Sequence, residues 1–206
     1  MKIIRNKARF SWLLILLYCF TYAFAYDVEV DGVYYNLNHD NRTAEITYKS
    51  YPSSSAATYS GTIVIPEVIT VDGNNYQVIS IGENAFGYCY ELESLTIPKT
   101  ISVIKSLAFY NISIEYLHIA DLLSWCNITY PSDAESTMAT PRPKHLVLNG
   151  QEIKNLVIPN DIHEIKPHTF AGCTGLETIV IPEGITTIGD HSFHWCTVTS
   201  LSLPQS

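Results

Sequence analysis

Short runs of alternating apolar and polar residues recur along the chain, and several of them end at a proline. One run is LETIVIP from Leu176 to Pro182, and another is IKNLVIP from Ile153 to Pro159. Alternation of this kind predicts a strand with one buried face, and the proline ends the strand because it has no N–H to donate to a neighbour. The I-x-x-I and A-F-x-x-C positions that follow are expected to turn the chain back toward the next strand.

These runs belong to a repeat with a period of about 23 residues. Phe86 precedes Phe109 by 23 residues, and Phe170 precedes Phe193 by the same interval. A single unit has too few apolar side chains to offset the entropy lost when it is ordered, so the units must stack to bury them. The period therefore predicts a β-rich solenoid of about five stacked units with short parallel strands.

The repeat resembles the BspA-type leucine-rich repeat over roughly residues 62–204. The segments that carry the resemblance are LTIPKTISVIKSLAF, LVIPNDIHEIKPHTFAGC and IVIPEGITTIGDHSFHWC. Departures are Ile112 in place of the cysteine, Ala120 in place of the proline, and a long interruption after Ile119. The resemblance implies a right-handed leucine-rich-repeat coil and an extracellular, non-catalytic binding or adhesion protein, which in this family sometimes contacts host matrix proteins. It carries no fixed catalytic residues.

The first 25 residues have the layout of a secretory signal peptide. Four basic residues precede an apolar run from Trp12 to Phe20, and Ala23-Phe24-Ala25 forms an A-x-A cleavage site. We therefore expect a secreted or cell-surface protein whose mature chain begins at Tyr26 and has no membrane span. Lipoprotein processing at Cys19 and a retained anchor are the alternatives.

The region from residue 26 to residue 60 lacks the repeat and predicts an antiparallel N-terminal β cap. Apolar residues flank Asp31-Gly32, which favours a hairpin, and Ala44 to Tyr48 alternates again. A cap would cover the apolar layer of the first coil. Residues 61–206 are then the solenoid, and its first unit contains a loop lengthened around Asp72-Gly73.

An insert at about residues 120–152 interrupts the repeat. Asp121 to Cys126 predicts a short helical turn, Pro131 to Pro143 a loop, and His145 to Ile153 a hairpin around Asn149-Gly150. Inserts in solenoids often carry function. The alternative is that Trp125 and Cys126 only fill a packing gap.

Charge and motifs exclude several classes of function. Without residues 1–25 the chain keeps eight of its twelve basic residues and all twenty acidic ones, a net charge of −12. Nucleic acid and anionic membranes are disfavoured partners. The segment HEIKPH is not a zinc-protease helix because Pro167 stands at the fourth position. His168 and His191 share one repeat position and are expected to stack as exposed side chains, so we predict no cofactor, no metal site and no enzyme.

The cysteines that follow the signal segment are expected to be buried free thiols. Cys89, Cys173 and Cys196 follow the repeat phenylalanines by three residues, and Ile112 occupies the same position in another unit. The position accepts an apolar residue, and cysteine there behaves as a small hydrophobe. A disulfide between Cys173 and Cys196, on adjacent coils, is the alternative.

The outward positions of the strands are the candidate binding site. If the leucines and isoleucines point inward, Tyr116, His118, Asn155 and Thr178 are among the side chains that form a ladder on the opposite face. Tyrosine beside histidine offers flat apolar surface with polar tips, which suits a protein or glycan ligand at the cell exterior. A face that is polar only because it meets water is the alternative. A further hypothesis is self-association through the C-terminal edge at Leu201 to Leu203.

Overall fold

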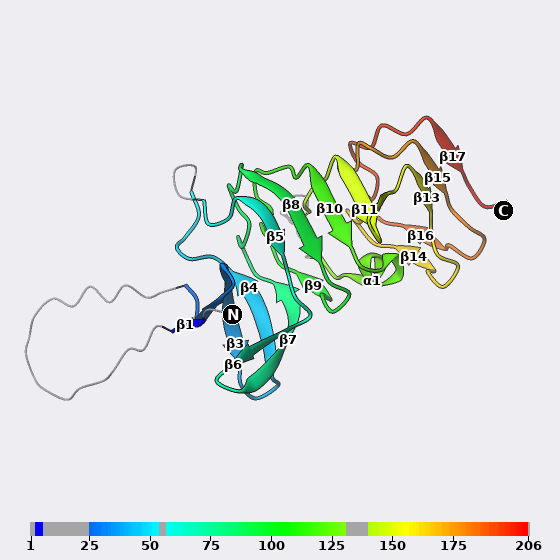
Figure 1. The fold of residues 1–206 in the computed structure, drawn as a ribbon. Coiled ribbons are helices and arrows are strands. Elements are labelled where there is room, and N and C mark those ends of the chain that lie inside the picture. The colour runs from blue at the N-terminus through cyan, green and yellow to red at the C-terminus, as the bar shows by residue number, and fades with distance from the viewer. Residues whose placement is uncertain (1–2, 6–24, 54–56, 131–139, 206) are drawn as a thin grey trace, which may run out of the picture.

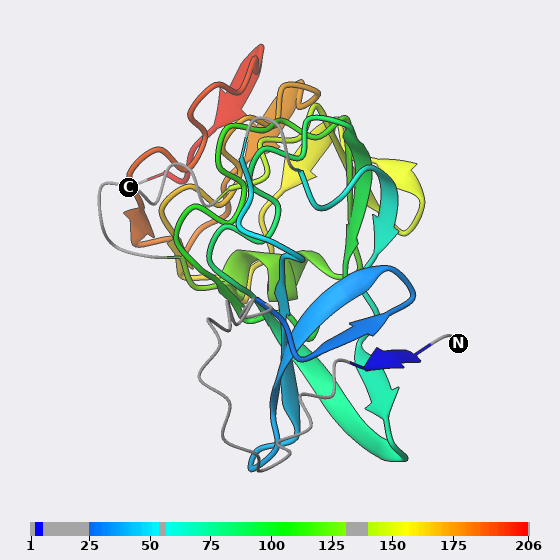
Figure 2. The ribbon, with the colours of Figure 1, turned by 90° about the vertical axis from the view of Figure 1, so that its left-hand side faces the viewer.

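The protein is a row of coils with a larger sheet at one end (Figure 1). The computed structural model describes residues 3–5, 25–53, 57–130 and 140–205. The N-terminal sheet and the C terminus lie at opposite ends of the row, and in the view along it the strands β3, β4, β6 and β7 extend beyond the outline of the coils (Figure 2).

Within the described residues, the N-terminal sheet has seven strands in the order β1-β2-β3-β4-β7-β6, with β9 also paired to β7. Its strands are β1 (Ile3–Arg5), β2 (Val28–Val30), β3 (Val33–Asn38), β4 (Thr43–Thr47), β6 (Val68–Val71), β7 (Asn74–Ile81) and β9 (Val103–Ile104). The predicted hairpin turns at Asp31 and Gly32, which both have positive φ. The pairing of β2, β3 and β4 is antiparallel.

The sheet is mixed and continues past residue 60, which differs from the expectation of a purely antiparallel unit. The predicted long loop of the first repeat is instead the β6–β7 hairpin, with its turn at Asp72 and Gly73. β7 then pairs in parallel with β4. Alternating Tyr76, Val78 and Ile81 are buried in the same core as β2–β4, and this burial accounts for the pairing.

The predicted signal segment lies outside the described residues except for Ile3–Arg5 and Ala25. Ile3–Arg5 forms β1, which pairs antiparallel with β2. No helix in the described ranges is long and apolar enough to cross a membrane.

The strands that begin each repeat form two parallel ladders rather than one. The first sheet has the order β12-β11-β10-β8-β5, and the second has the order β13-β15-β17. Their bounds are β5 (Gly61–Val64), β8 (Leu92–Ile97), β10 (Tyr116–Ile119), β11 (His145–Leu148), β12 (Gln151–Glu152), β13 (Asn155–Val157), β15 (Thr178–Val180) and β17 (Ser200–Ser202). β14 (Glu164–Ile165) and β16 (Thr187–Ile188) pair in parallel on the other side of the coils.

Stacked aromatic rings run through the core from coil to coil. The rings of Phe86 and Phe109 are 5.2 Å apart and nearly parallel, at 8°. Phe170 and Phe193 repeat the arrangement at 5.5 Å and 3°. Tyr59 extends the first stack, with its ring 4.9 Å from that of Phe86. The 23-residue spacing thus places one ring per coil directly above the next.

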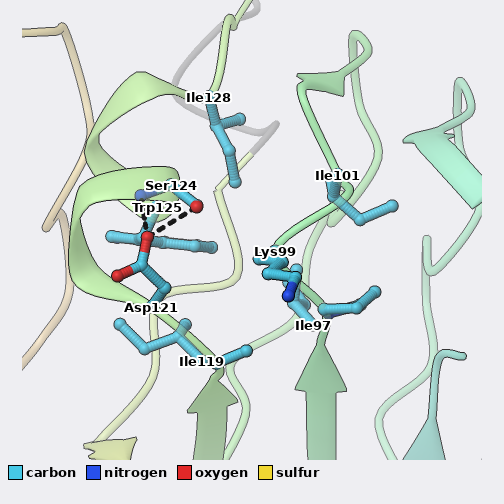
Figure 3. A pocket seen from close by; sticks show the side chains of 10 residues that line it. Ile97, Lys99, Ile101, Ile119, Asp121, Ser124, Trp125 and Ile128 are labelled. Atoms are coloured by element: carbon cyan, nitrogen blue, oxygen red, sulfur yellow. Dashed lines mark hydrogen bonds between the residues drawn. The ribbon is translucent and has the colours of Figure 1, made fainter. Parts of the chain in front are cut away.

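The insert fills the space between two coils. The predicted helical turn is α1 (Leu122–Asn127), and its first turn is capped by Asp121, whose carboxylate accepts bonds from the backbone N–H and hydroxyl of Ser124, both at 2.6 Å (Figure 3). Trp125 is 3 % exposed and donates from Nε1 to the Thr169 carbonyl oxygen at 3.0 Å. The cavity that remains beside it holds only about 10 Å³. Trp125 and Cys126 therefore serve packing, and this space has no room for a ligand.

The rest of the insert also has an ordered part. The predicted hairpin at Asn149-Gly150 is confirmed as β11 and β12. Residues 131–139 of the predicted loop lie outside the described residues, and residues 140–143 form neither helix nor strand.

All four described cysteines are free thiols. Cys89, Cys126 and Cys173 are buried, as the repeat pattern predicts, and Cys196 is half-buried. Burial raises the pKa of the Cys126 thiol to about 12 and that of Cys196 to about 11. Cys196 donates to the Phe170 carbonyl oxygen at 3.1 Å rather than bonding to Cys173.

The phenylalanine stack yields a stability prediction. Phe109→Ala removes a fully buried ring between coils, and we expect it to lower the free energy of unfolding by about 3–5 kcal/mol. Urea unfolding followed by circular dichroism measures the loss. Val157→Ala, at a side chain that is 58 % exposed, is the control and should change it by less than about 0.5 kcal/mol. Similar losses in the two variants would contradict the role of the stack.

The Asp121 cap yields a prediction about pH. The bonds from the Ser124 hydroxyl and backbone N–H lower the pKa of Asp121 below its ordinary value. The cap therefore contributes fully above the unfolded pKa of about 3.9, and its contribution is lost as pH falls through the folded-state pKa. We expect Asp121→Ala to cost about 1 kcal/mol at pH 7, and the gap to the unmodified protein to close in strong acid.

Asp121→Asn separates the charge from the hydrogen bond, because asparagine is also a good cap. It should lose less stability at pH 7 than Asp121→Ala does. A gap that widens as the pH falls, measured by thermal unfolding across a pH series, would show that the cap does not act in this way.

Candidate binding site on the strand face

The outward face of β10 carries the two most distinctive predicted site residues. Leu117 and Ile119 point into the core and are at most 3 % exposed, whereas Tyr116 is 44 % exposed and His118 is half-buried. Alternate residues of a strand point to opposite faces, so Tyr116 and His118 share the outer face. β10 lies between β8 and β11 in parallel register.

Tyr116 lies beside His145, a residue that the sequence analysis placed in the insert. The two are direct neighbours in the β10–β11 register, and their rings stack with centroids 4.9 Å apart at 22°. On the other side Tyr116 neighbours the small Ser94, and His118 neighbours Thr96 and Val147. The pair therefore forms a flat aromatic surface whose outer ring is open to solvent.

Two carboxylates hold the His145 ring in place. Nδ1 of His145 lies 2.6 Å from Oε1 of Glu152 on β12, and Nε2 lies 3.7 Å from Oε1 of Glu115. The second oxygen of Glu115 accepts from Lys144 Nζ at 2.7 Å. This hydrogen bond lowers the pKa of Glu115 and raises that of Lys144. The strand-face patch, defined as Tyr116, His118, His145, Glu115 and Lys144, thus presents an aromatic plate beside fixed charges of both signs.

Asn155 and Thr178 lie outside this patch. They are neighbours in the β13–β15 register, and the Thr178 hydroxyl donates to Oδ1 of Asn155 at 2.8 Å. The expectation of one continuous ladder through all four residues is wrong, because the antiparallel strand β12 follows β11 and ends the first sheet. The predicted residues are therefore brought together in two pairs on two sheets.

His145 was missed because the insert hid a repeat strand. HLVL from His145 to Leu148 has the same apolar alternation as YLHI from Tyr116 to Ile119, and β11 occupies the next position in the ladder. The similarity of these two short runs was the available signal. The interval between them is longer than the repeat period, which concealed it.

The histidines at the repeat turns form a separate cluster. His168 and His191 stack as expected, with centroids 5.2 Å apart at 16°, and His194 stacks on Trp195 at 4.3 Å. His168 is only 4 % exposed, so the expectation of two exposed side chains is wrong for this residue. Burial, with a smaller effect of His191, lowers the pKa of His168 and keeps it neutral.

The turn histidines do not constitute a metalloprotease motif. Glu164 and Ile165 of the HEIKPH segment form strand β14 rather than a helix, so the geometry that a zinc protease needs is not built. Among the residues that the structure describes, no group of three histidine, cysteine, aspartate or glutamate side chains is placed to hold a metal ion.

Comparison with protein families finds the same repeat. The family model for the BspA-type leucine-rich repeat region matches six copies, over residues 64–130 and 145–206. The second match starts at β11, in agreement with its place in the strand ladder, and exceeds the expected five units by one. Comparison with curated protein sequences finds no match.

Solved structures of leucine-rich repeat proteins share the fold. A leucine-rich repeat protein from Bacteroides ovatus is 26 % identical with a TM-score of 0.52, and the alignment covers 87 % of this chain but only 42 % of that one. A leucine-rich cell surface protein from Faecalibacterium prausnitzii is 17 % identical with a TM-score of 0.33, covering 85 % and 76 % of the two chains. The pneumococcal vaccine antigen PcpA is 16 % identical with a TM-score of 0.43, covering 84 % and 48 %.

The stacking of Tyr116 on His145 can be tested without a ligand. A proton above the face of an aromatic ring resonates upfield, so Tyr116→Leu is expected to move the His145 ring protons downfield in the NMR spectrum. Tyr90→Leu replaces a comparably exposed tyrosine elsewhere and should leave them unchanged. Unchanged His145 signals in Tyr116→Leu would show that the rings do not stack in solution.

Proposed function

Because the chain belongs to the BspA-type leucine-rich repeat family, we propose that it is a non-catalytic binding protein of the cell exterior. It is secreted or held at the cell surface after export by residues 1–25. Its strand-face patch recognises a macromolecule, a protein or glycan, and so gives the protein an adhesive role.

The observation that carries this proposal is the exposed ring of Tyr116 stacked on a histidine that two carboxylates hold in place. Tyrosine is enriched among the residues that dominate binding energy because it buries a large flat surface and keeps a polar tip. A side chain that is already fixed loses little entropy when a partner binds. The patch is therefore organised before it meets a ligand.

A protein ligand is favoured over a glycan at this patch. Charges of both signs, from Glu115 and Lys144, flank the aromatic plate. An aromatic centre with a polar, charged rim is the usual composition of a protein interface. The rim also suits an oppositely arranged pair of charges on a partner, which would set the orientation of docking.

The architecture proposed with this function is a right-handed coil over residues 61–206, closed at its first coil by residues 26–60. Parallel strands joined by crossovers are almost always connected with right-handed topology, which supports the handedness. The packing of Tyr34 against Tyr59, with centroids 6.1 Å apart, supports the capping role, since Tyr59 belongs to the first aromatic stack.

A second candidate function is assembly through the C-terminal edge. Within the described residues β17 pairs with β15 alone, and Leu201 and Leu203 are more than half exposed. An edge strand with apolar side chains can accept a strand from another copy. Sedimentation velocity tests this role, since Leu201→Lys should abolish any self-association that depends on it.

The binding role is tested by presenting the protein to arrays of extracellular matrix proteins and of bacterial and host glycans. The double variant Tyr116→Ala, His118→Ala should weaken a saturable interaction by at least about 30-fold, the effect of losing one interface hot spot of about 2 kcal/mol. The matched control is the double variant Asn155→Ala, Thr178→Ala, which changes the second sheet and should retain binding.

The outcomes separate the candidate surfaces. Loss of binding in the first variant alone places the site on the strand-face patch, and a hit among proteins rather than glycans supports the favoured ligand class. Binding that survives in both variants, or a blank array with a cooperatively folded protein, would contradict the proposal.

A further inference from the structure

A pocket walled by tyrosines lies at the turns that precede β5 and β8, away from the outward side chains of the strand face. It has a volume of about 350 Å³ and is lined by residues 57–60 together with Tyr88, Tyr90 and Glu91. This volume falls within the range of about 300–1,000 Å³ that is typical of small-molecule sites. We call it the tyrosine pocket.

Its wall is a rigid group of rings with an exposed face. The Tyr88 ring meets that of Tyr90 edge to face at 6.1 Å, and that of Tyr110 at 5.1 Å. Nδ2 of Asn111 donates to the Tyr90 hydroxyl at 2.7 Å, which fixes the orientation of that side chain. Tyr90 is nevertheless 54 % exposed. The ring is thus held from one side and open on the other.

The floor of the pocket is fixed by the core. Tyr59 is 3 % exposed and packs on Phe86, and its hydroxyl donates to the Thr47 carbonyl oxygen and accepts from the Tyr34 N–H. These contacts join the floor to the N-terminal sheet. A ligand would therefore meet a surface that does not have to be ordered on binding.

The backbone at Tyr88 does not favour a tyrosine. Its φ is +58°, and the same repeat position is Asn111 at +57° and Gly172 at +76°. Glycine and asparagine adopt the left-handed region at low cost, whereas a bulky aromatic residue there is strained. The coil would thus be built more favourably with a smaller residue. A strained bulky residue at the mouth of a pocket is a reason to look for a function.

The polar groups of the pocket indicate the chemistry of its ligand. Threonine, serine and tyrosine hydroxyls line it, Glu91 is its one charged lining residue, and no cationic side chain is among them. Burial, followed by the hydrogen bond with Tyr110, raises the pKa of Tyr88, so its hydroxyl stays neutral at ordinary pH. An anionic ligand would meet the Glu91 carboxylate without a counter-charge. A ligand that is neutral and rich in hydroxyl groups suits both the rings and the acceptors.

We propose that the tyrosine pocket binds a neutral carbohydrate, with a sugar ring lying on the exposed face of Tyr90 and its hydroxyls bonded to Glu91 and the surrounding hydroxyl groups. The C–H face of a sugar covers the aromatic ring, and the sugar hydroxyls replace the water that the polar lining loses. This site is separate from the strand-face patch and gives the protein a second, glycan-directed contact.

The test uses the whole chain and measures binding of neutral and anionic polysaccharides by isothermal titration calorimetry. The neutral probes are soluble mannan, a soluble β-glucan and maltoheptaose, and heparin is the anionic probe. At least one neutral probe is expected to bind, while heparin is not. Tyr90→Ala should weaken that binding at least tenfold, and Glu91→Ala should weaken it as well.

Three controls keep the result interpretable. Tyr90→Phe keeps the ring and should retain most of the affinity, and thermal unfolding should show that Tyr90→Ala folds, because its side chain is half exposed. The double variant Tyr116→Ala, His118→Ala should bind the carbohydrate normally, so this proposal can fail or hold independently of the strand-face patch. Absence of neutral carbohydrate binding, equal affinity in Tyr90→Ala, or binding of heparin alone would overturn it.

Discussion

The aromatic stack between coils is the interaction on which the rest of the structure depends. The rings of Phe86 and Phe109, and those of Phe170 and Phe193, lie nearly parallel about one strand spacing apart. A coil offers only half of the environment that its own ring needs, and the next coil supplies the other half. The row is therefore stable as a whole and not unit by unit.

Fixing the core in this way leaves the outward positions free to vary. Leu95 and Leu117 are fully buried at equivalent positions of β8 and β10, while Ser94 and Tyr116 face outward beside one another. Because the backbone is held by the inward side chains, an outward tyrosine or histidine costs the fold little. The strand-face patch is thus a surface carried by the repeat and not required by it.

The turns offer a second kind of surface for the same reason. Each coil passes through the left-handed region two residues after the core phenylalanine, at Tyr88, Asn111, Gly172 and Trp195. Cross-coil backbone bonds hold these turns, such as the one from the Tyr88 N–H to the Tyr110 carbonyl oxygen at 3.0 Å. A repeat that needs only the backbone at this position can place a functional side chain there. In the first coils that side chain is aromatic, and the tyrosine pocket results.

The sequence by itself determined the repeat, the inward leucines and isoleucines, the phenylalanine stack, the buried cysteines, the α1 turn and the hairpin at Asn149-Gly150. These features follow from the spacing of residues that are close along the chain, and spacing is legible without coordinates. The tertiary structure alone decided that β11 lies beside β10, that β12 divides the ladder between Tyr116 and Asn155, and that β7 joins the N-terminal sheet. Lateral neighbours depend on how the long loops close and on register between distant segments, and these are settled only by the packing of the whole core.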